Sequence, residues 1–288
     1  MLDSLLSLAR RSGRRWLYAF LSVTVALGLV VGSPHATQAI SIGDLIRGGI
    51  QVIQGVQIGN MSDEQEVDFG RQIDRRLRSR EIRLYRDPEI NAYIDQIGKR
   101  LAANSDRPNI PYTFQIVNDK SINAFATTGG FVYVNTGLIA EADNEAQLAS
   151  VIAHEIGHIV HRHVLKSIQK AALEQGLVSA AGLERNTAIG LGVQLGLRLP
   201  RSREYEYQAD ESGLRTLTKA GYAPIGMTGF FEKLLNKRGS VPTFLSTHPN
   251  TRDRIEAINR VIDPATANQG DGLDSAAYKA KIQKLLQR

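Results

Sequence analysis

The sequence contains no cysteine among its 288 residues, and this absence limits its chemistry. No disulfide framework can form, no thiolate can bind a metal, and no N-terminal cysteine can carry a lipid. Any metal site must therefore be built from histidine and carboxylate side chains. Aromatic residues are few, at 6%, but 42% hydrophobic and 22% charged residues are ordinary for a globular protein.

Long hydrophobic runs are also scarce. The apolar run at 16–31 is shorter than the roughly 20 residues that a membrane-spanning helix needs. Four arginines precede it and small residues follow it up to Ala39, a pattern typical of a secretory signal peptide cleaved after Ala39. We therefore expect export to the periplasm or an equivalent compartment. An uncleaved N-terminal anchor, with membrane association through this segment, is the alternative.

Basic residues are not spread widely enough to indicate nucleic-acid binding. The net charge is +6, and Arg10, Arg11, Arg14 and Arg15 against Asp3 supply half of it before residue 16. The remaining excess is small for a chain of this size, so we expect no nucleic-acid partner.

Hydrophobic periodicity predicts mostly helices after the N-terminal segment. Ser62 with Gln65 forms a capping box, and Asp87 followed by Pro88 is a second helix start. Either Asp143 or Asn144 caps a third helix, and Gly221 ends another. The predicted helices span 62–80, 87–104, 143–163, 202–220, 224–236 and 251–261, with a helix and a mobile loop in 175–199.

Two segments, 112–117 and 130–135, instead alternate β-branched and aromatic residues. They predict a small antiparallel sheet, and hence an α+β fold that is mostly helical. No internal repeat occurs. The predicted division is a signal peptide or anchor at 1–39, a linker or amphipathic segment at 40–60, a catalytic domain at 61–263, and a linker with a basic helical tail at 264–288.

The segment His154-Glu155-Ile156-Gly157-His158 carries the strongest chemical signal. Residues four apart on a helix share one face, so both imidazoles can reach one zinc ion. Glu155 is rotated by about 100° from His154, so it cannot bind the metal beside them but can hold a water. This is the HExxH arrangement of a zinc hydrolase, with glutamate as general base.

A second helix supplies further carboxylates. Glu206, Asp210 and Gly213 share one helical face, and Gly213 would permit close approach to a neighbouring helix. Glu206 is the predicted third metal ligand, and Asp210 is placed to hydrogen-bond a ligating histidine. Glu204 and Glu211 are expected to be solvated.

These motifs resemble the metallopeptidase family that includes HtpX, the CAAX prenyl protease and the mitochondrial Oma protease, in which HExxH is followed by ExxAD on a later helix. The resemblance covers about 62–262 and includes Asn123-Ala124-Phe125-Ala126 with Gly129-Gly130, and Thr247-His248-Pro249 with Arg254. It implies a zincin-like (gluzincin) domain holding one zinc ion per chain on His154, His158 and Glu206, with Glu155 as base. Lacking the several spanning helices of the membrane members, the chain resembles the soluble exported branch.

The remaining histidines have different expected roles. A metzincin would need glycine at 161 and histidine at 164, where the chain has His161 and Val164. His161 is expected near the site or facing solvent, and His163 on the opposite side of the helix, in packing or hydrogen bonding. The family resemblance places His248 facing the zinc, as an oxyanion stabiliser or as a removable fourth ligand. A histidine in an ordinary turn is the alternative.

The predicted function is that of a zinc-dependent endopeptidase acting in quality control of exported or unfolded proteins. An extended substrate should add as a strand to an edge near 131–134, contacting Asn123, Ala124, Phe131 and Val132. The rival hypothesis is a periplasmic chaperone or assembly factor that binds extended polypeptide and carries a latent zinc site.

Overall fold

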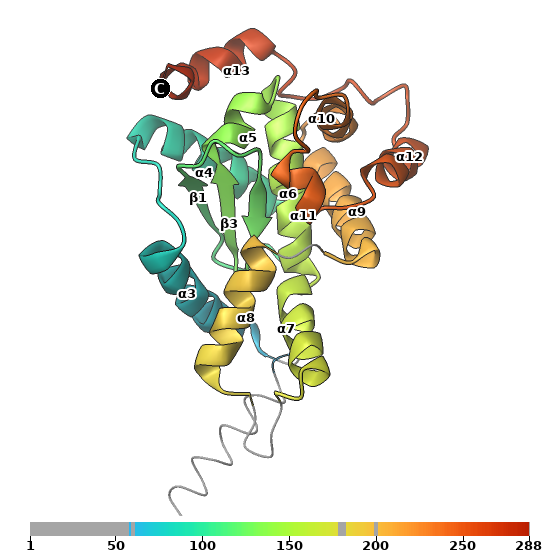
Figure 1. The fold of residues 1–288 in the computed structure, drawn as a ribbon. Helices are drawn as coiled ribbons and strands as arrows, with labels where there is room; N and C mark the ends of the chain where they lie inside the picture. The colour runs from blue at the N-terminus through green and yellow to red at the C-terminus, as the bar shows by residue number, and fades with distance from the viewer. Residues whose placement is uncertain (1–57, 59–60, 178–182, 199–200, 288) are drawn as a thin grey trace, which may run out of the picture. The chain divides into compact units, whose positions relative to one another are not determined.

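The computed structural model describes residues 58, 61–177, 183–198 and 201–287 (Figure 1). The predicted signal peptide or anchor lies outside these residues. Among the described residues, no helix combines the length and the apolar character needed to cross a membrane. The helices are α3 (Asp63–Arg80), α4 (Pro88–Ala103), α5 (Thr136–Glu141), α6 (Glu145–Val160), α7 (His163–Glu174), α8 (Arg185–Leu197), α9 (Arg203–Lys219), α10 (Ile225–Leu235), α11 (Thr243–Thr247), α12 (Thr251–Val261), α13 (Ser275–Lys281) and α14 (Gln283–Leu286).

The sheet has the strand order β1-β3-β2. β1 (Thr113–Val117) runs parallel to β3 (Phe131–Asn135), and β2 (Ala124–Ala126) is antiparallel to β3. The mostly helical α+β class is confirmed. The predicted antiparallel pairing of the two longer strands was wrong, because the short strand β2 reverses the chain once more between them.

The two faces of the sheet contribute to separate apolar clusters, as the alternation of side chains along a strand requires. Phe114 and Val132 point to the face packed with α4, α6 and α9. Phe125 and Tyr133 belong to the cluster on the opposite face, which also contains residues of α3, α7 and α8. β3 lies between the other two strands, and all its residues are buried.

Four helices begin at capping residues that the sequence indicates, and each of these side chains accepts a backbone N–H of the first turn. Ser62 and Gln65 form the reciprocal capping box of α3. Asp87, Asn144 and Ser202 cap α4, α6 and α9, each through a side-chain oxygen that accepts from a first-turn amide. These contacts satisfy amides that the helix itself leaves unpaired.

The helix that carries the two predicted ligand histidines is shorter than expected. α6 ends at Val160, and Arg162 has a φ of 55°, in the left-handed region. A left-handed residue interrupts the path of a right-handed helix, so α7 starts in a new direction at His163. Ion pairs from Arg162 to Asp63 and Glu66 of α3, at 2.6 and 3.0 Å, hold this turn in place.

The helical C-terminal tail predicted after residue 263 packs on the core. Tyr278, Ile282 and Leu285 of α13 and α14 are buried in the main apolar cluster. The Tyr278 hydroxyl donates a hydrogen bond of 2.6 Å to the carbonyl of Ile139 in α5. The sequence showed an amphipathic tail, but not the surface on which its apolar side packs.

Candidate metal centre

Four side chains from three parts of the chain meet in the interior. His154 and His158 come from α6, Glu206 from α9, and His248 directly follows α11. One potential ligand atom from each lies within 4.8 Å of the others, and all four residues are buried. The structure thus brings together the three predicted zinc ligands and the histidine that was expected to face the zinc.

Close packing of α6 against α9 produces this convergence. A Cβ built on Gly213 of α9 would lie 3.0 Å from the backbone of His154. A Cβ on Gly157 of α6 would lie 2.7 Å from the carbonyl oxygen of Ala209. Each glycine therefore lets the opposite backbone approach, and the approach brings Glu206 to the level of the two histidines.

Hydrogen bonds orient both α6 imidazoles. Nδ1 of His154 lies 2.9 Å from Asp210 Oδ1, which leaves Nε2 directed at the cluster. Nδ1 of His158 lies 2.8 Å from Nδ1 of His163, whose Nε2 lies 2.9 Å from Oε1 of Gln208. A proton donated along each path leaves a lone pair on the inner nitrogen, as metal binding requires.

Arg254 forms ion pairs with both carboxylates, Asp210 and Glu206. Its guanidinium is fully buried and lies 2.6 Å from Asp210 and 2.7 Å from Glu206. Because this charge pairs with both carboxylates, Arg254 positions one predicted ligand directly and His154 through Asp210. From the sequence, only the family resemblance connects Arg254 with the site.

The electrostatic environment favours a cation. Burial opposes protonation of His154, but hydrogen bonds to Asp210 and Glu206 outweigh it and raise its pKa to about 9. Burial would raise the pKa of Glu206, yet the charges of His248 and Arg254 hold it well below its ordinary value. Burial lowers the pKa of His158 and of His248, so the site keeps its carboxylates ionised and these two rings neutral, the state in which an imidazole can bind a metal.

Glu155 stands beside the cluster with unused hydrogen-bonding capacity. Both of its carboxylate oxygens are buried and, within the described residues, neither has a hydrogen-bond partner. Nε2 of His248 is also buried without a hydrogen-bond partner among the described residues, and it lies 3.4 Å from Glu155. Buried polar groups are rarely left unpaired, so these atoms fit a site completed by a metal ion and a water or substrate.

The residues at the other predicted positions lie as follows. Glu204 and Glu211 are exposed, as expected. His161 is half-buried and takes no part in the four-residue cluster. The prediction that His163 lies opposite His158 was wrong, because it assumed that the helix continues through Arg162. Its expected hydrogen-bonding role is confirmed by the contact with His158.

The predicted substrate-binding edge also needs correction. Phe131 and Val132 belong to β3, which is paired on both sides and offers no edge. The edge on this side of the sheet belongs to β2, which contains Ala124 and directly follows Asn123. The amide of Thr127 donates to Phe131 and the carbonyl of Asn123 accepts from Asn135, so the backbone groups of Ala124 and Ala126 point away from β3, although both residues are fully buried.

Sequence reasoning missed Arg201 and Phe244. Arg201 is nearly buried, donates to the carbonyl of Ala126 at 3.3 Å, and lies 3.8 Å from Glu155. Phe244 stacks on the His248 ring, with centroids 4.3 Å apart. Arg201 precedes the Ser202 cap of the Glu206 helix and Phe244 lies one turn before His248, but neither position has a distinctive residue pattern.

Comparison with known proteins gives the same family as the motifs. The model of peptidase family M48 matches residues 88–262, which include all four residues of the cluster. A putative beta-barrel assembly-enhancing protease of Vibrio cholerae is 37% identical over 67% of this chain and 43% of its own length. The beta-barrel assembly-enhancing protease of Escherichia coli K12 is 33% identical over 69% of this chain and 44% of its own length.

A mitochondrial metalloendopeptidase OMA1 of Arabidopsis thaliana is 36% identical over 56% of this chain and 33% of its own length. The chain thus spans less than half the length of these curated relatives. Since the family match covers more than half of the chain and includes both helices of the buried histidine and carboxylate cluster, the chain belongs to peptidase family M48 and carries the metallopeptidase domain that its motifs resemble.

Proposed function

We propose that this chain is a zinc-dependent endopeptidase, with one zinc ion held by His154, His158 and Glu206 and with Glu155 as general base. The observation that carries this proposal is the convergence of four buried ligand atoms within 4.8 Å, beside a buried carboxylate that has no hydrogen-bond partner among the described residues. Histidine and carboxylate ligands are the ones that hydrolytic zinc sites use.

The proposed chemistry divides between the metal and the side chains. When bound, zinc supplies Lewis acidity, which polarises a peptide carbonyl and makes water a stronger acid. Glu155 accepts the proton of the attacking water and delivers it to the leaving amine. Asp210 and Arg254 keep His154 and Glu206 in their orientations throughout.

The substrate would lie extended against β2. The backbone groups of Ala124 and Ala126 that point away from β3 are buried, and they would pair with a polypeptide of any sequence once Arg201 releases the Ala126 carbonyl; Asn123 lies at the start of the same edge. Arg201 contacts Ala126 at this edge and reaches toward Glu155. Recognition through main-chain groups suits a protease that acts on unfolded polypeptide.

We further propose that the role is quality control of exported proteins. The N-terminal pattern of a signal peptide or anchor supports export, and the names of the bacterial relatives refer to beta-barrel assembly. The rival function is an assembly factor that binds polypeptide while His248 closes the zinc site. The observation that supports this rival is the position of His248, whose Nδ1 lies 3.1 Å from Glu206, close enough to occupy the metal site.

The decisive experiment compares the purified chain with its Glu155→Gln variant in metal content and casein digestion. We expect about one zinc per chain in both, digestion by the unaltered chain that a chelator abolishes, and a loss of at least roughly a hundredfold in the variant. If the Glu155→Gln variant still digests casein, another group must accept the proton of the attacking water. Absent digestion, with suppression of client aggregation by both proteins, would favour the assembly factor.

A further inference from the structure

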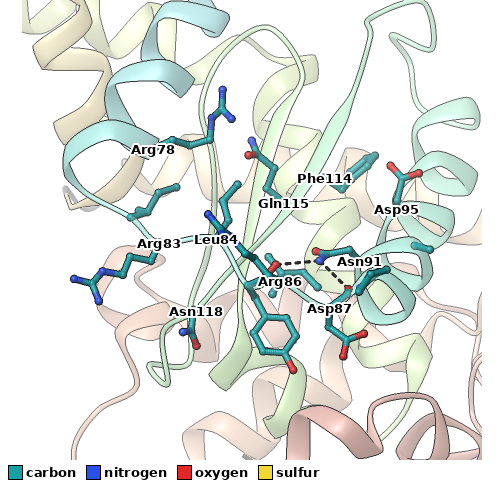
Figure 2. Close-up of a pocket in the computed structure, with 15 residues that line it drawn as sticks. Arg78, Arg83, Leu84, Arg86, Asp87, Asn91, Asp95, Phe114, Gln115 and Asn118 are labelled. Atoms are coloured by element: carbon teal, nitrogen blue, oxygen red, sulfur yellow. Dashed lines mark hydrogen bonds between the residues drawn. The ribbon is translucent and has the colours of Figure 1, made fainter.

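The sheet has a second edge, on the side away from β2, and a groove runs along it. The groove has a volume of about 1110 Å³ and lies between the end of α3, the start of α4 and strand β1 (Figure 2). Its floor is apolar and includes Ile82, Leu84 and Phe114. None of the residues of the candidate metal centre lines it.

The backbone of β1 lacks partners along this groove mainly at Phe114, which is 8% exposed, whereas Ile116 is 1% exposed. The amide of Thr113 donates to Gly130, so residues 113, 115 and 117 bond to β3 and residues 114 and 116 face outward. The Ile116 carbonyl accepts from the amide of Tyr85, where the chain segment 83–85 covers the far end of the strand. Among the described residues, the N–H and C=O of Phe114 and the N–H of Ile116 have no partner.

The rim of the groove is positively charged. Arg83 and Arg86 are exposed and form no ion pair within the described part of the chain, and half-exposed Arg78 pairs with Asp74 at 2.9 Å. The acidic lining residues are engaged elsewhere. Asp87 caps α4, and Asp95 pairs with Lys99 at 2.6 Å.

The surrounding segment strengthens this charge. Residues 71–86 contain seven arginines against two acidic residues, a net +5 in a chain of net +6. The carboxylate of Glu81 is paired with Arg198 of α8, at 2.6 Å. The groove therefore combines a partly unpaired strand edge, an apolar floor and a rim of three arginines.

We propose that this groove is a docking site for an extended polypeptide segment that carries acidic side chains, separate from the site of hydrolysis. The peptide would add as a strand beside Phe114, place alternate apolar side chains on the floor, and direct carboxylates toward Arg83 and Arg86. An anionic lipid surface would match the charge, but it offers no backbone groups for the strand edge and would contact only the rim of a concave groove.

The test uses a fluorescein-labelled peptide of alternating glutamate and valine, with anisotropy measured against the full chain carrying Glu155→Gln to prevent cleavage. We expect saturable binding that a chelator leaves unchanged. The double variant Arg83→Glu/Arg86→Glu should weaken it roughly tenfold or more, because two attractive contacts become repulsive. The control double variant Arg260→Glu/Lys281→Glu reverses two exposed charges on α12 and α13 and should bind normally.

Two further peptides separate the backbone and charge contributions. Lysine in place of glutamate should abolish binding, and proline in place of the central valine should weaken it, since proline cannot donate to the strand edge. Equal binding by the Arg83→Glu/Arg86→Glu and control variants, or no binding to the full chain, would overturn the proposal. So would binding to phosphatidylglycerol vesicles that requires the two arginines while the peptide fails to compete.

Discussion

Gly213 of α9 lies directly against the backbone of His154, so that a Cβ at this position would stand 3.0 Å from both its N and its Cα. The neighbouring atoms are backbone and cannot rotate away. We expect Gly213→Ala to push α9 from α6 and lower stability by about 1–3 kcal/mol, the usual cost of overpacking, and to weaken zinc binding because Glu206 moves with α9. Thermal unfolding and metal analysis measure the two effects.

The matched control is Gly190→Ala in α8, where a Cβ would meet nothing within 4 Å. Alanine is the better helix former, so this variant should be neutral or more stable by up to about 1 kcal/mol. Similar losses in both variants would show that the effect is not specific to the α6–α9 contact.

Glu206→Gln tests the proposed ligand set. The change preserves the size of the side chain but replaces an ionised carboxylate with a neutral amide. The variant should therefore lose zinc and casein digestion together. Full retention of zinc would remove Glu206 from the ligands and leave His248 as the third one.

Arg254→Met should be among the most damaging substitutions in the molecule. Its guanidinium is fully buried between Asp210 and Glu206, and removing one partner of a buried ion pair costs about 3–5 kcal/mol. Urea unfolding measures the loss. Arg260→Met, at an exposed position on α12, serves as the control, and an equal stability of the two variants would contradict the positioning role of Arg254.

His248→Ala distinguishes two roles with opposite outcomes. We expect zinc to be retained and casein turnover to rise, because His248 lies within 3.1 Å of Glu206 and 3.2 Å of His154, as a resting ligand would. If the imidazole instead stabilises the oxyanion, turnover should fall by roughly a hundredfold to a thousandfold. Unchanged zinc content and unchanged turnover would place His248 outside the catalytic step.

Export predicts a new N-terminus. In a host that secretes the protein, the chain isolated from the extracytoplasmic fraction should begin at or near Ile40, because the basic head and short apolar run precede small residues at 37–39. N-terminal sequencing provides the measurement. Met1 on membrane-bound protein would indicate an anchor.

The sequence predicted the helices and the cluster best where the signals are local. Helix caps at Ser62 and Asp87, and residues four apart such as His154 and His158, depend only on nearby positions. The predicted strand direction was wrong because it depended on the short strand β2. The predicted position of His163 was wrong because it depended on the left-handed backbone of Arg162. Arg201 and the docking of Tyr278 could not be predicted, since long-range packing alone determines them.

The buried carboxylate of Glu66 links three separate stretches of the chain. Its carboxylate is inaccessible to solvent and contacts Arg107 at 2.7 Å, Arg162 at 3.0 Å and the Thr128 hydroxyl at 2.6 Å. These partners belong to separate stretches of chain, so none can detach alone without leaving a buried charge unpaired. In hydrogen exchange, the start of α3, the turn after β2 and the turn between α6 and α7 should therefore open as a single cooperative unit rather than fray independently.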